Sequence, residues 1–79
     1  MARIYWYVVV DGANWAVKRE GGPTLRSFNL QSAAIDHATG LAKTHNSLSG
    51  EPTGVRIQGQ GGQFRDERTY GNDPFPPRG

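Results

Sequence analysis

The side chains that could do chemistry in this 79-residue chain are few and widely spaced. His37 and His45 lie eight positions apart in a segment that we predict to be helical, and only Asp36 is close to them in sequence. A metal site needs several ligands that converge on one ion. We therefore expect two solvated histidines and no metal site.

The acidic residues and the glycine-rich segment do not form a catalytic motif either. Asp66 and Glu67 are adjacent in a predicted strand, so they should point to opposite faces and cannot act as a carboxylate pair on one bond. Residues 59–62, Gly-Gln-Gly-Gly, lack the Gly-Lys-Ser/Thr of a phosphate-binding loop. The serines show no nucleophile elbow or triad spacing. We expect no enzyme and no cofactor.

The first half of the chain reads as a meander of strands. Residues 4–10 are aromatic and β-branched without interruption, which favours a strand. Residues 11–14 tolerate a tight turn, and residues 15–18 then alternate large apolar with small or charged side chains, so the two runs predict a hairpin. After a second turn signal, residues 24–28 could add a third strand.

One amphipathic helix is expected from Leu30 to about His45, because its apolar residues recur at intervals of three and four. Asn29 precedes it as a suitable N-cap. Gly40 lies in mid-helix, where its missing side chain would let the helix approach the sheet closely.

Two more strands follow, at residues 55–58 and 63–70, joined by a turn at 59–62. The charges at 66–68 indicate an edge strand or a bulge. The predicted fold is α+β: a small antiparallel sheet of four to five strands with one helix packed on one face, in the order ββ(β)αββ. We place this single domain at residues 1–70.

Residues 71–79 form a proline-rich C-terminal tail that cannot enter a central strand. Its Pro-Phe-Pro-Pro-Arg segment suits a polyproline II ligand. We favour instead a tail in which Phe75 docks on the domain's own surface, or one without an ordered position.

Register decides which side chains face the helix. We place one set inward, against the apolar stripe of the helix: Trp6, Val8, Trp15, Val17, Val55, Ile57 and Phe64. The other set then faces outward: Tyr5, Tyr7, Val9, Lys18, Arg56, Gln58 and Arg65.

The outward set is the one unusual surface. Two aromatic residues at positions i and i+2 of a strand, with cations alongside, are what a sheet needs to stack bases and neutralise phosphates. The predicted binding residues are Tyr5, Tyr7, Lys18, Arg56 and Arg65. Tyrosines also suit exposed strands in general, and the same face could form a homodimer contact or be covered by the tail.

Composition and the N-terminal sequence indicate the cellular compartment and the kinds of partner to expect. Nine Lys and Arg against seven Asp and Glu give a formal charge of +2, which permits weak attraction to polyanions without requiring it. There is no cysteine, which favours a reducing compartment. The N-terminus lacks the pattern of a signal peptide, and no apolar run approaches the roughly 18 residues of a membrane span. We expect a cytoplasmic protein with no membrane partner.

Three segments together resemble domain-of-unknown-function family 2188 of bacteria: residues 14–21, Asn-Trp-Ala-Val-Lys-Arg-Glu-Gly; the helix with Ala33-Ala34-Ile35; and residues 69–79, from Thr-Tyr-Gly-Asn-Asp-Pro-Phe to the end. The resemblance covers most of the chain, and the ending is its most specific part. It brings no activity, catalytic residue or cofactor. A weaker likeness of pattern is to the sheet-and-helix DNA-binding domains of some phage integrases, through Phe28-Asn29 before the helix.

The function that these observations favour is a non-enzymatic accessory or protein-interaction module, acting as a homodimer through the outward face. A nucleic-acid-binding protein that uses the same face is the alternative.

Overall fold

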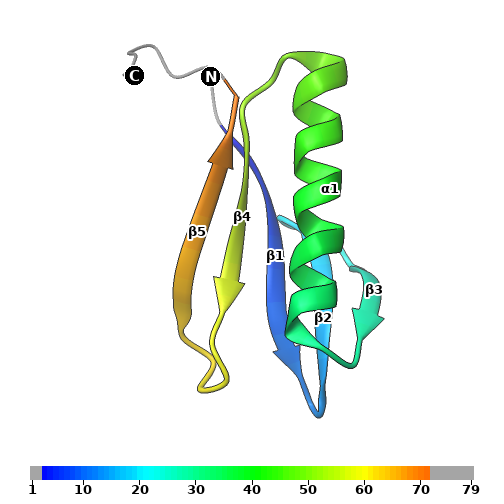
Figure 1. The fold of residues 1–79 in the computed structure, drawn as a ribbon, viewed down its shortest axis with the longest axis vertical. Coiled ribbons are helices and arrows are strands. Elements are labelled where there is room, and N and C mark those ends of the chain that lie inside the picture. The colour runs from blue at the N-terminus through cyan, green and yellow to red at the C-terminus, as the bar shows by residue number, and fades with distance from the viewer. Residues whose placement is uncertain (1–2, 72–79) are drawn as a thin grey trace.

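The structure is a computed structural model that describes residues 3–71. Figure 1 shows one long helix lying along a twisted sheet. In chain order the elements are β1 (Ile4–Asp11), β2 (Asn14–Arg19), β3 (Thr24–Phe28), α1 (Gln31–Ser49), β4 (Thr53–Gln58) and β5 (Phe64–Tyr70). The predicted tail, apart from Gly71, lies outside the described residues, and so does the expected docking of Phe75.

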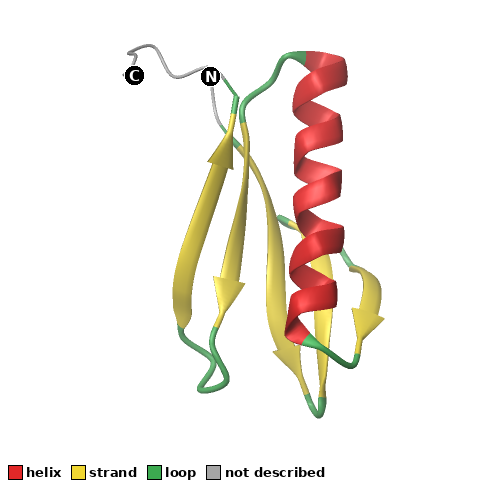
Figure 2. Ribbon diagram, in the orientation of Figure 1, coloured by secondary structure: helices red, strands yellow, loops and turns green. Residues whose placement is uncertain are grey.

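The five strands lie in the order β3-β2-β1-β4-β5, with α1 on one face (Figure 2). The predicted α+β class, the third strand and the helix on one face are confirmed. The sheet is mixed, however, and not antiparallel throughout, because β1 and β4 pair in parallel. Because β1, β2 and β3 are successively antiparallel, β3 runs in the same direction as β1. The helix α1 then returns the chain to the end of the sheet where β1 starts, so β4 runs parallel to β1.

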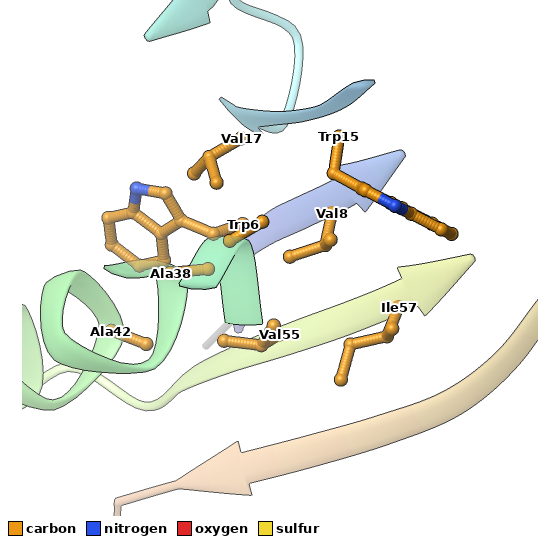
Figure 3. Packing of buried hydrophobic residues seen from close by; sticks show 9 residues of the cluster. Trp6, Val8, Trp15, Val17, Ala38, Ala42, Val55 and Ile57 are labelled. Atoms are coloured by element: carbon orange, nitrogen blue, oxygen red, sulfur yellow. The ribbon is translucent and has the colours of Figure 1, made fainter. Parts of the chain in front are cut away.

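The core lies between α1 and the three middle strands. Trp6 and Val8 from β1 meet Trp15 and Val17 from β2 and the β4 pair Val55 and Ile57 (Figure 3), which confirms those six inward positions. The helix contributes only small buried side chains, those of Ala34, Ala38 and Ala42. The small side chains on this face of the helix leave room in the core for the two large tryptophan rings.

Two hydrogen-bonding side chains fasten β4 to its neighbours. Thr53 is fully buried, and its Oγ1 donates to the Ala42 carbonyl over 2.8 Å, which joins the start of β4 to the helix. Arg3 Nη1 donates to the carbonyls of Thr53 at 2.8 Å and Tyr70 at 3.1 Å, across β4 and β5.

The helix differs from its predicted form in three ways. It starts at Gln31 after Leu30, which is the N-cap and provides no side-chain bond, so the predicted capping by Asn29 is wrong. It continues four residues past His45 and ends where Gly50 adopts the left-handed conformation and donates to Asn46 O. Gly40 faces solvent with nothing within 4 Å of a Cβ placed on it, so its expected close approach to the sheet is also wrong.

Phe64 is not in the core, contrary to the prediction. Ile57 pairs with Asp66 and Gln58 pairs with Phe64, so Arg65 is an extra residue in the β5 ladder. A bulge of this kind turns the residues before it to the opposite face. Phe64 is therefore turned away from α1 and is 52% exposed. The expectation that the charged segment marks an edge strand or a bulge is confirmed, since β5 lies at the edge of the sheet and contains a bulge.

Candidate binding surface on the open sheet face

The surface of interest is the sheet face turned away from α1, which no other element within residues 3–71 covers. We call it the open face. Strand alternation and register assign to it Tyr5, Tyr7, Val9, Ala16, Lys18, Gly54, Arg56, Gln58, Phe64, Glu67 and Thr69. Its centre is a row that crosses four strands in register: Lys18 on β2, Tyr7 on β1, Arg56 on β4 and Glu67 on β5.

Tyr5, Arg56 and Glu67 form a closed network on this face. The Arg56 guanidinium lies over the Tyr5 ring with its Cζ 4.0 Å from the centroid, and its Nε donates to Glu67 Oε1 over 3.1 Å. The Tyr5 hydroxyl donates to the other carboxylate oxygen of Glu67, also over 3.1 Å. The pKa of Arg56 is raised, first by hydrogen bonding to Tyr5 and then by the charge of Glu67, against the effect of desolvation.

Gly54 positions the Tyr5 ring within this network. A Cβ placed on Gly54 would stand 2.6 Å from Tyr5 Cε1, which means that the ring occupies the space that any side chain at position 54 would need. The ring therefore has Gly54 in contact and Arg56 stacked on one face. Tyr5 is half-buried, and these contacts hold its ring in place.

Tyr7 and Phe64 form the second part of the surface. Their ring centroids are 5.6 Å apart with planes inclined by 52°. The sequence predicts Tyr7 on this face but places Phe64 inward, because strict alternation along β5 ignores the bulge. The charges at 66–68 indicate such a bulge, and a bulge before Asp66 predicts Phe64 on the open face.

The remaining predicted binding residues are only partly brought together. Lys18 lies in the central row beside Tyr7. Arg65 is the bulge residue, and its side chain lies over Gly59 at the edge of the sheet. It borders two open hollows of about 370 Å³ each, one with Arg56 and Phe64 and the other beside the start of α1. Arg65 is thus at the rim of the open face.

The residues considered first for chemistry are in structural contacts. Asp66 and Glu67 do point to opposite faces, as expected, since Glu67 is bound to Arg56 and Asp66 lies near Arg68 on the helix side. The histidines are not simply solvated. The rings of His45 and Trp6 pack edge to face, with centroids 5.6 Å apart, and His45 also hydrogen-bonds to Glu51 over 2.8 Å. His37 packs against Phe28.

Residues 3–71 offer neither a cluster of metal ligands nor a membrane-spanning helix. No group of three or more potential metal ligands occurs in this part of the chain. None of its helices is long and apolar enough to cross a membrane.

Fold and surface together define a small α+β module with one helix-covered and one open sheet face. The chain belongs to the DUF2188 family, described as uncharacterized protein conserved in bacteria, whose model matches residues 5–70. The resemblance found in the sequence is confirmed by this match. The comparisons with curated proteins and with solved structures gave no match.

Proposed function

We propose that this protein is a non-enzymatic interaction module that binds a protein partner through the open face, and that it forms a homodimer. The observation that carries the proposal is the closed network of Tyr5, Arg56 and Glu67 beside the apolar pair Tyr7 and Phe64. Tyr and Arg are enriched at the centres of protein interfaces, where rigid, pre-positioned side chains lose little entropy on binding.

An enzymatic use of this face has less support. Its charged groups satisfy one another, because Arg56 and Glu67 are bound together and Tyr5 donates to the same carboxylate. The hollow beside them is open to solvent, whereas catalytic groups work best in a site that excludes water. The lack of cysteine supports a reducing compartment, and we place the module in the cytoplasm.

The sheet edges support the face as the contact surface. On β3, Leu25 is an extra residue, since Val17 pairs with Arg26 and Lys18 pairs with Thr24. On the opposite edge, β5 has its bulge at Arg65. Bulges and charges on edge strands oppose the addition of another strand. Association by addition of a strand to either edge of the sheet is therefore disfavoured, which leaves the open face as the proposed contact surface.

The proposal is tested with one face variant and one control. Tyr7→Ser combined with Phe64→Ser removes one half-buried and one exposed ring from the open face, and Leu48→Ser removes an apolar side chain that is 83% exposed on the helix. We expect wild type and Leu48→Ser to bind a protein, either themselves in light scattering or another protein in affinity purification, and the face variant to lose that binding. Equal behaviour of all three proteins would refute the proposal.

Nucleic-acid binding through the same face is the second candidate, and the position of Phe64 favours it. With Tyr7 it gives two adjacent rings on a sheet that also carries Lys18, and bases stack on such rings. Against it, Arg56 is bound to Glu67, and Tyr5 is already stacked. Titration with single- and double-stranded oligonucleotides at low salt separates the two candidates, because nucleic-acid binding must appear there and weaken steeply as salt rises.

A further inference from the structure

The strand register places charged and aromatic residues of the open face in an order that is complementary to itself. The central row reads, from β2 to β5, Lys18, Tyr7, Arg56, Glu67. We infer that the partner is a second copy of this chain, packed face to face about a twofold axis that runs parallel to the strands, between β1 and β4. The inference rests on the proposed function, because it specifies how the two copies of the proposed homodimer pack at the same surface.

Charge complementarity is the first argument. A twofold axis between β1 and β4 places β2 of one copy opposite β5 of the other, and β1 opposite β4. Lys18 then faces Glu67 of the second copy, and Tyr7 faces its Arg56. Each contact occurs twice, as the symmetry requires. Lys18 thus adds a second cation to the Glu67 carboxylate that Arg56 already contacts, and Tyr7 packs against the guanidinium that already lies over Tyr5, so both contacts extend the network and do not replace it.

Size complementarity in the next row is the second argument. Val9 pairs with Ala16, and the backbone N–H of Val10 donates to the Gln58 side chain over 2.8 Å, while Gln58 pairs with Phe64. This row therefore runs Ala16, Val9, Gln58, Phe64. The same axis sets the ring of Phe64, which is 52% exposed, opposite Ala16, which has the smallest side chain of the row and is itself covered by its neighbours. The protruding ring therefore lies over the smallest side chain of the row and contacts mainly the residues around it.

The other in-plane twofold arrangement is unfavourable. If the axis crossed the strands at the central row, each strand would lie opposite itself. Lys18 would face Lys18, Arg56 would face Arg56 and Glu67 would face Glu67 of the second copy. Like charges placed directly opposite each other destabilise a contact. Of these two arrangements, only the first brings unlike charges together.

The small area of the two rows indicates that the proposed dimer is weak. The two rows cover four strands about 4.8 Å apart, with residues about 3.3 Å apart along each strand, so this patch has an area of roughly 300 Å² in projection. Stable dimers bury about 800 Å² per partner. Because the patch is far below that size, we expect a weak, salt-sensitive dimer that forms only at high protein concentration.

Charge exchange tests this geometry. Lys18→Glu leaves two acidic ends on the central row, and Glu67→Lys leaves two basic ends, so each variant should repel its own copy. We expect at least a tenfold weaker self-association for each, by analytical ultracentrifugation at up to about 1 mM in low salt. An equimolar mixture should form a heterodimer at least tenfold stronger than either variant's own dimer, because both acid–base contacts are restored, and its formation also shows that both variants are folded. The control is Lys43→Glu, which makes the same change of charge on α1, and this variant should dimerise as strongly as the wild type.

Three results would overturn the inference, and they differ in what they mean for the proposed function. A wild type that stays monomeric to 1 mM but captures another protein through Tyr7 and Phe64 refutes the homodimer and keeps the interaction module. Self-association that depends on those rings but gives no heterodimer in the mixture refutes the twofold arrangement alone. A monomer that binds no protein refutes both.

Discussion

Replacing Gly54 with alanine is the sharpest test of how the open face is organised. The new Cβ would stand 2.6 Å from Tyr5 Cε1, 2.9 Å from Tyr5 Cδ1 and 3.2 Å from the carbonyl oxygen of Arg68. Ordinary carbon contacts are about 3.5 to 4.0 Å. The Tyr5 ring would have to move by about 1 Å, away from its bond to Glu67 and its stack with Arg56.

The expected cost combines two opposing effects. Forcing an extra methyl group into a filled space costs about 1 to 3 kcal/mol. Alanine loses less chain entropy than glycine on folding, which returns about 0.4 to 1 kcal/mol. We expect Gly54→Ala to lower the free energy of unfolding by about 1 to 2 kcal/mol, or the melting temperature by about 5 to 15 °C in a domain of this size.

Urea unfolding followed by tryptophan fluorescence suits the measurement, because Trp6 and Trp15 are 5% and 8% exposed in the folded state and become solvated on unfolding. The same substitution is then made in a Tyr5→Ala background. With the ring gone, alanine at position 54 should cost less than about 0.5 kcal/mol, so the two changes are strongly non-additive.

An equal cost in both backgrounds would refute the reasoning. It would assign the effect to the Arg68 carbonyl on β5 and not to the ring of Tyr5. The network of Tyr5, Arg56 and Glu67 would then be a loose surface contact, and the idea of a pre-positioned face would lose its main support.

Three further substitutions test the helix and its attachment, each by urea unfolding. Gly40→Ala should stabilise the protein by about 1 kcal/mol, because the position is helical and open to solvent. A destabilised variant would show that something packs there. Leu30→Asp should stabilise it by about 0.5 to 2 kcal/mol by adding the missing N-cap bond, and no gain would mean that the helix start is already satisfied. Thr53→Val should cost about 1 kcal/mol, because the buried bond to Ala42 is lost while the shape is kept; an unchanged stability would contradict that bond.

The inward residues could be predicted because alternation is a local property. Trp6 and Val8, like Val55 and Ile57, are two positions apart, so a strand of either direction buries both members of each pair. The direction of β4 could not be predicted from the same pattern, since parallel and antiparallel strands alternate alike. It depends on the path that α1 takes across the sheet, which is a property of the whole chain.

The helix ends illustrate a different limit. Periodicity identified the buried stripe, but the last turn of α1 contains Asn46, Ser47 and Ser49, which are typical of loops. In the structure Ser49 Oγ donates to the His45 carbonyl and Gly50 closes the helix, so local hydrogen bonds outweigh weak propensities. At the other end Asn29 has the right chemistry for a cap and stands one residue too early.

The open face depends on both kinds of information. Tyr5, Tyr7, Lys18 and Arg56 reach it by alternation alone, whereas Phe64 reaches it only because Arg65 is inserted in β5. Without that residue Phe64 would turn toward α1, and the face would lose its most exposed ring. The row from Lys18 to Glu67 likewise exists only because β4 lies between β1 and β5. Single strands therefore predict which residues are exposed, but the self-complementary order of charges and ring sizes arises from strand order and from one bulge.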